Sequence, residues 1–95
     1  MTGSPSTRRS IAFDPTPYGT LDALYDRDPR VADALDQAVD WIESDPPDSR
    51  AKRRRFTNGM WAITVHEAGQ EWVILWEEPA PNAPVVRHIG EATSI

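Results

Sequence analysis

The stretch that decides the fold runs from residue 50 to residue 95 and reads RAKRRRFTNGMWAITVHEAGQEWVILWEEPAPNAPVVRHIGEATSI. After Ser49 its apolar and polar residues alternate, a period of two that is typical of strands half-buried in a sheet. Residues 52–57 and 60–66 are predicted as two such strands. Asn58-Gly59 lies between them, and this dipeptide favours a tight hairpin because both turn positions need a positive φ.

A second hairpin is expected at residues 67–70, with a return strand at 71–78. This strand is apolar on both faces, so we expect it at the centre of the sheet. Its two sets of apolar residues are Trp72, Ile74 and Trp76 on one side and Val73 and Leu75 on the other. Residues 79–84 hold three prolines, which favours a surface crossover. Residues 85–89 are predicted as the last strand.

The acidic first half of the chain predicts a short strand and two helices. Residues 11–13 are apolar and precede the sequence DPTP, so we expect a short edge strand that the prolines end. Thr20 is expected to cap a short first helix. The apolar side of that helix would be formed by Leu21, Leu24 and Tyr25.

The second helix has the clearest signals. Asp28-Pro29 gives a capping side chain with proline at the first helical position, and prolines at 46 and 47 end the helix near Ser44. One apolar stripe at helical spacing follows from Val31, Leu35, Ala38 and Ile42, with Ala34 and Trp41 beside them. We therefore predict a single α+β domain over residues 11–95, in which a short strand and an α-hairpin pack on an antiparallel sheet of about four strands. Residues 1–10 are predicted to be a disordered tail.

Composition excludes several classes of protein. The 95 residues suffice for one domain, and at 39% hydrophobic residues its core is small, although four tryptophans enlarge it. The chain has no cysteine, so it has no disulfide framework, and this fits a cytoplasmic location. No segment approaches the roughly 20 apolar residues of a membrane span, and the first ten residues do not form a signal peptide.

The charge of −5 is unevenly distributed. Acidic residues crowd positions 14–48, whereas a compact basic run is formed by Arg50, Lys52, Arg53, Arg54 and Arg55. The acidic balance argues against coating nucleic acid, because that binding scales with positive charge. The basic run is compatible with a local phosphate contact and equally with an acidic protein partner, and charge alone does not choose between them.

Metal-independent RNA cleavage needs a base, an acid and a cation on the phosphate. His66 and His88 are the candidate acid and base, with Arg55 as the catalytic cation and the basic run 52–55 as the RNA-binding segment. A structural role competes in each case. The run can be a solvated edge, His66 can be exposed and idle, and His88 can be a half-buried sheet residue. The tryptophans at 61, 72 and 76 are better explained as core than as base-stacking platforms. No HExxH or comparable ligand spacing occurs, so we expect no metal and no other cofactor.

The element order strand-helix-helix and four strands, with Phe56-x-Asn58-Gly59-x-Trp61 and a final VVRHIG at 85–90, resembles the RelE/ParE superfamily of bacterial type II toxins over about residues 10–95. That resemblance implies a toxin neutralised by a cognate antitoxin protein. RelE-like members bind the ribosome and cut mRNA, whereas ParE-like members inhibit DNA gyrase. The resemblance also implies that the basic run 52–55 is the strand that contacts RNA phosphates.

The chain departs from the RelE-like pattern at several places. Ala62 and Val73 stand where the family commonly has arginine after an aromatic residue, and Glu91-Ala92 stand in place of His-Arg after Ile-Gly. A terminal tyrosine is also missing. The first hypothesis is a diverged endoribonuclease that inhibits translation. The alternatives are a non-enzymatic ParE-like inhibitor of a protein target and an inactive relative that serves only in binding or regulation.

Overall fold

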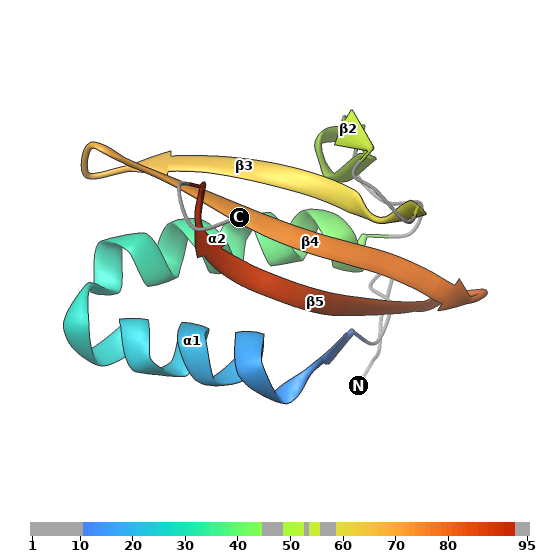
Figure 1. The fold of residues 1–95 in the computed structure, drawn as a ribbon, viewed down its shortest axis with the longest axis horizontal. Helices are drawn as coiled ribbons and strands as arrows, with labels where there is room; N and C mark the ends of the chain where they lie inside the picture. The colour runs from blue at the N-terminus through green and yellow to red at the C-terminus, as the bar shows by residue number, and fades with distance from the viewer. Residues whose placement is uncertain (1–10, 45–48, 53, 56–58, 93–95) are drawn as a thin grey trace, which may run out of the picture.

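The fold is known from a computed structural model that describes residues 11–44, 49–52, 54–55 and 59–92. It is an α+β fold in which two helices pack on one mixed sheet (Figure 1), as predicted. In chain order the elements are β1 (Ala12–Phe13), α1 (Pro15–Arg27), α2 (Pro29–Glu43), the 3-10 turn η1 (Ser49–Lys52), β2 (Arg54–Arg55), β3 (Trp61–Glu67), β4 (Gln70–Ala80) and β5 (Ala83–Glu91).

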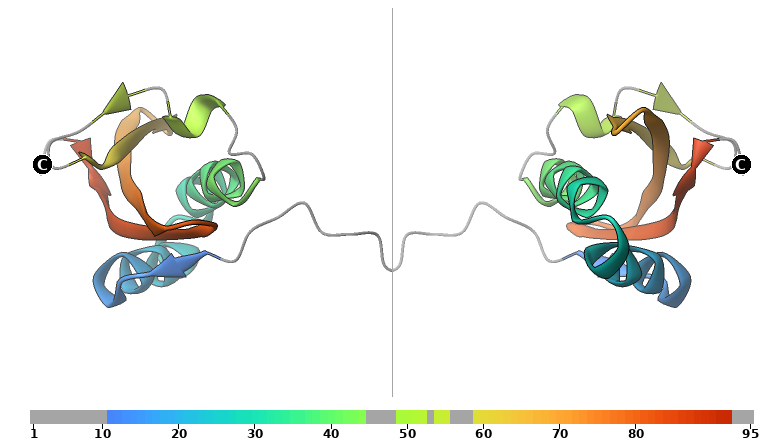
Figure 2. Two further views of the ribbon diagram at one scale, coloured as in Figure 1. Left: turned by 90° about the vertical axis from the view of Figure 1, so that its right-hand side faces the viewer. Right: turned by 90° about the vertical axis from the view of Figure 1, so that its left-hand side faces the viewer.

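The sheet order is β1-β5-β4-β3-β2, in which β1 runs parallel to β5 and the other neighbours are antiparallel. The central position of β4 and the edge position of β1 are as predicted. The helices run antiparallel in Figure 1, with α2 behind the strands and α1 alongside β5, and the end-on views in Figure 2 show a strongly curved sheet with α2 inside its curve.

The first helix begins earlier than predicted. It starts at Pro15, with Asp14 in the N-cap position, and Thr20 lies inside it with its Oγ1 donating to the Thr16 carbonyl at 3.0 Å. Proline is tolerated in a first helical turn because that N–H has no helical partner anyway. The prolines therefore open the helix as well as end the strand. Tyr25, assigned to the apolar side, is 43% exposed.

The second helix spans Pro29–Glu43, with the Asp28 side chain accepting from the Val31 N–H at 3.4 Å. The predicted stripe is confirmed, since all four of its members are fully buried. They join sheet residues in a single core, whose sheet side is made of Ile63, Val65, Trp72, Ile74, Trp76, Val86 and Ile89. Trp41 is only half-buried against this core.

The hairpin between β3 and β4 forms where it was predicted. Its two turn residues, Ala68 and Gly69, have φ of 55° and 76°. Register then pairs Trp61 with Trp76 and Ile63 with Ile74, so the core residues of both strands share one face.

Residues 79–84 do not form the predicted surface crossover. Strand β4 continues to Ala80 and β5 begins at Ala83, with only Pro81 and Asn82 between them. Asn82 has a φ of 59°, and its N–H donates to the Glu78 carboxylate at 2.9 Å. The ladder is irregular between Glu77 and Ala80, and this irregularity accommodates proline within a strand.

The basic run is also not one regular strand. It begins in η1, whose Ala51 is fully buried and accepts a hydrogen bond from Trp76 Nε1 at 2.8 Å. Only Arg54 and Arg55 follow as β2, paired with Ala62 and Trp61. Gly59 has the expected positive φ of 79°. Arg53, residues 56–58 of the first hairpin and the predicted tail 1–10 lie outside the described residues.

Candidate functional site

The sheet has an inner face that belongs to the core and an outer face that points away from α2. Paired strand residues project to the same face, so the register assigns the outer face directly. Two rows cross it, Ala62–Leu75–His88 and Thr64–Val73–Gly90. Among the residues that the structure describes, no helix lies over this face in Figure 1. We call these six residues the outer face.

The centre of the outer face is apolar. Ala62 and Leu75 are buried, although neither belongs to the core cluster, and Val73 is half-buried. Ala62 and Val73 are two positions at which the resemblance described above predicts arginine. In this chain those two positions therefore supply no cation to the outer face.

His88 lies on the outer face beside Leu75 and is half-buried. Its Nε2 atom is fully buried and makes no hydrogen bond within the described part of the chain. A buried imidazole nitrogen without a partner is unfavourable, so His88 is the polar group of this face that most needs a partner.

His66 lies on the same face but far along the sheet. It pairs with Glu71, four β4 positions from the Leu75 that pairs with His88, so the two histidines are separated by about 13 Å along the strands. The His66 side chain is 73% exposed, and its Nε2 is 3.9 Å from a Glu71 carboxylate oxygen. The structure therefore does not bring the two candidate acid-base residues together.

Lys52 and Arg55 of the basic run lie on the inner side of the sheet edge. The Arg55 guanidinium carbon is 4.3 Å from the centre of the Trp61 ring, and Lys52 Nζ is 5.6 Å from it. Trp61 pairs with the core residue Trp76, so Arg55 and His88 project to opposite faces. Cation–π contacts of this kind hold the two cations on the ring. The three catalytic candidates, His66, His88 and Arg55, are thus not assembled in one site.

The rest of the basic run adds one contact that the sequence did not indicate. The Arg50 guanidinium lies 4.3 Å from the centre of the Trp41 ring. A tryptophan and an arginine nine positions apart, in different elements, give no periodic signal, so only the tertiary structure reveals this pair. Arg54 pairs through its backbone with Ala62, and Arg53 lies outside the described residues.

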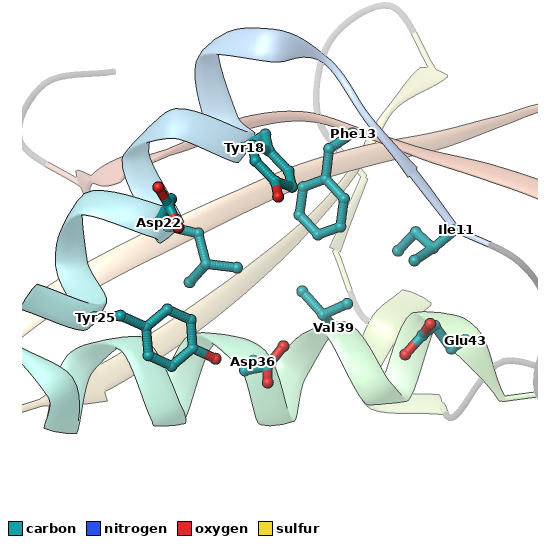
Figure 3. A pocket seen from close by; sticks show the side chains of 9 residues that line it. Ile11, Phe13, Tyr18, Asp22, Tyr25, Asp36, Val39 and Glu43 are labelled. Carbon is teal, nitrogen blue, oxygen red and sulfur yellow. The ribbon is translucent and has the colours of Figure 1, made fainter.

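The helices and β1 enclose a groove of about 260 Å³, which was also not predicted (Figure 3). It is lined by Ile11, Phe13, Tyr18, Leu21, Asp22, Tyr25, Asp36, Val39 and Glu43. Tyr18 and Tyr25 are the exposed large hydrophobic residues of the described chain, at 62% and 43%. Their spacing of seven places them on one side of α1, which is the signal that sequence reasoning missed.

The environment of the groove raises the pKa of Tyr25. Its partial burial raises its pKa to about 12, together with a hydrogen bond to Asp36 and the negative charges of Asp36, Asp33 and Asp40. In Figure 3 the Tyr25 hydroxyl points toward Asp36 across the space between the helices. The groove thus combines an apolar lining with a negative potential.

Arg87 connects three elements near the start of α1. Its Nε donates to Glu77 at 2.7 Å and its Nη1 donates to Asp14 at 3.1 Å. The hydrogen bond to Glu77, and then that to Asp14, raises the pKa of Arg87, against the opposing effect of desolvation. Both partners already satisfy this arginine, so we assign it to the fold.

Within the described ranges no group of three or more His, Asp or Glu side chains is placed to hold a metal ion. Among the same residues, no helix is long and apolar enough to span a membrane.

Comparison of the chain with protein-family models, with curated proteins and with solved structures gave no match.

Proposed function

We propose that this chain is the toxin-type member of a bacterial toxin–antitoxin pair and that it acts by binding a protein target rather than by cutting mRNA. The resemblance to RelE/ParE toxins and the α-hairpin on a largely antiparallel sheet support the first part. The observation that carries the second part is the apolar outer face, with Ala62 and Val73 where RelE-like nucleases have arginine.

The distribution of candidate catalytic groups supports the same conclusion. A metal-independent nuclease needs its acid, base and phosphate cation around one phosphate. Here His66 and His88 are far apart on the outer face, and Arg55 and Lys52 lie against Trp61 on the other side. A binding role needs no such convergence.

Ribosome-dependent mRNA cleavage is the second candidate, and one observation favours it. Lys52 and Arg55 approach the same Trp61 ring, so two cations share one region of the sheet edge, and a local cluster of cations favours contact with a phosphate backbone. In that case the family likeness implies the ribosome and its bound mRNA as partners.

Expression from an inducible promoter in a bacterial host, with growth and mRNA 5′ ends followed together, separates the candidates. We expect growth arrest with intact mRNA. New 5′ ends inside reading frames would establish the nuclease instead, and unimpeded growth with a folded protein would refute the toxin assignment.

Matched variants sharpen this experiment. His66→Ala should leave the arrest unchanged if the protein only binds, because this imidazole then moves no proton and lies outside the six residues of the outer face. It should abolish arrest by a nuclease that uses His66. The double variant Lys52→Ala/Arg55→Ala tests the basic run against Arg30→Ala, an exposed arginine on α2.

A further inference from the structure

The groove between α1, α2 and β1 gathers apolar side chains from three segments of the described chain. Leu21 and Val39 contribute from the two helices, and Ile11 and Phe13 contribute from the first strand region. Tyr18 and Tyr25 stand at its opening. Exposed apolar side chains that gather at one hollow mark an interaction site more often than scattered ones do.

The size of the groove indicates the kind of occupant. At about 260 Å³ it lies just below the range of roughly 300–1,000 Å³ that is usual for small-molecule and cofactor sites. It can take one large side chain of a protein partner. Tyrosine is enriched at the centres of protein interfaces, because its ring buries much area while its hydroxyl keeps a polar contact.

The charge of the groove indicates the chemistry of the occupant. Asp22, Asp36 and Glu43 line it. Residues 11–44 carry eight carboxylates and only two basic residues, Arg27 and Arg30, neither of which lines the groove. Complementary charge steers a cationic partner to such a surface and disfavours an acidic one.

We propose that this groove docks a basic segment of a partner protein, which inserts one large apolar side chain between Tyr18 and Tyr25 and sets Lys or Arg against Asp22, Asp36 and Glu43. The docking site is independent of the toxin assignment. A chain without any effect on growth would still bind such a segment. Conversely, toxicity alone would not establish that the groove binds one.

The test uses the full chain and a fluorescein-labelled synthetic peptide in which Lys and Arg flank a single Phe. Two comparison peptides carry Ala in place of the Phe, or Glu in place of every Lys and Arg. We expect saturable anisotropy changes with the first peptide, at least about tenfold weaker affinity with the second and no binding of the third.

Variants locate the site. Asp22→Asn/Asp36→Asn/Glu43→Gln should weaken the basic peptide at least about tenfold, because three complementary charges are removed. The control Asp26→Asn/Glu71→Gln/Glu91→Gln removes the same charge at exposed positions outside the groove and should change affinity less than about threefold. Tyr18→Ala, at an exposed position, tests the apolar contact without risk to the core.

NMR chemical-shift mapping of the same complex decides the outcome. Perturbations confined to residues around Tyr18, Leu21, Tyr25 and Val39 are expected. Equal weakening by both triple variants, perturbations on the outer face, or no saturable binding would overturn the proposal. So would a dimer in solution whose interface covers the groove, since a second copy of the chain would then be the occupant.

Discussion

At the scale of single residues, aromatic side chains do most of the positioning. Trp76 is fully buried, and its Nε1 donates to the Ala51 carbonyl, so one indole fills the core and also fixes η1 against the sheet. Trp61 holds Lys52 and Arg55, and Trp41 holds Arg50. Among the described residues, Arg50 and Lys52 are therefore placed by tryptophans, and Arg55 by Trp61 together with the β2–β3 pairing.

The two most buried tryptophans of the sheet provide a matched comparison. Trp76→Phe removes ring volume and also leaves the buried Ala51 carbonyl unpaired, which costs about 1–3 kcal/mol in addition to the cavity. Trp72→Phe removes similar volume, but its Nε1 makes no hydrogen bond within the described structure. Urea unfolding should show the larger loss of stability for Trp76→Phe. Equal losses would mean that the hydrogen bond to Ala51 contributes nothing.

Tyr25 gives the molecule a measurable pH dependence. Its pKa of about 12 in the folded state exceeds the ordinary value of 10.0. A raised pKa means that the neutral form is favoured by folding. The resulting stabilisation is complete below pH 10 and is lost as the pH rises through about 12.

Alkaline titration followed by tyrosinate absorbance should show a component near pH 12 that disappears in Tyr25→Phe. Asp36→Asn should move this component to lower pH, because it removes a negative charge beside the hydroxyl. Persistence of the component in Tyr25→Phe would contradict the assignment.

At the scale of elements, the two hairpins of the β3–β4–β5 meander are built differently. The β3–β4 turn places Ala68 and Gly69 at positive φ, whereas the β4–β5 turn uses Pro81 and Asn82. Asn adopts a positive φ readily, but alanine pays a steric cost for it. The first turn therefore contains a residue poorly suited to its conformation.

Replacement of that residue should stabilise the hairpin. Ala68→Gly relieves the strain at φ 55° and should raise the free energy of unfolding by up to about 1 kcal/mol, net of the greater entropy of glycine in the unfolded chain. Ala23→Gly, at an exposed position inside α1, should lower it by about 1 kcal/mol. Chemical denaturation measures both, and a loss of stability in Ala68→Gly would show that the turn is unstrained.

At the scale of the whole molecule, charge and fold divide the chain in the same way. The acidic α-hairpin packs against the core side of the sheet and along β5, whereas Arg50 and Lys52 lie in η1 and Arg55 lies in the edge strand β2. The protein thus offers a negative groove on its helical side and a positive patch at the sheet edge. Partners of opposite charge can bind to these two surfaces without competing for one site.

The sequence by itself determined the elements with strong local signals. Asp28-Pro29 and the stripe from Val31 to Ile42 specified α2, and alternation with a turn at 67–70 specified β3 and β4. Local rules did not decide the DPTP segment, because proline both ends strands and begins helices. Local rules also did not predict the tight turn within residues 79–84. Only the pairing of β4 with β5 shows that the residues on either side of this turn lie in a ladder.

Only the tertiary structure decided the site. His66, His88 and Arg55 were grouped by chemical type, but register separates the histidines along the sheet and places Arg55 on the opposite face. The groove joins residues from β1, α1 and α2 that are spread over positions 11–43 of the chain. Periodicity and capping act over a few residues, whereas a site is formed by packing between distant segments, and the sequence carries no local signal for that packing.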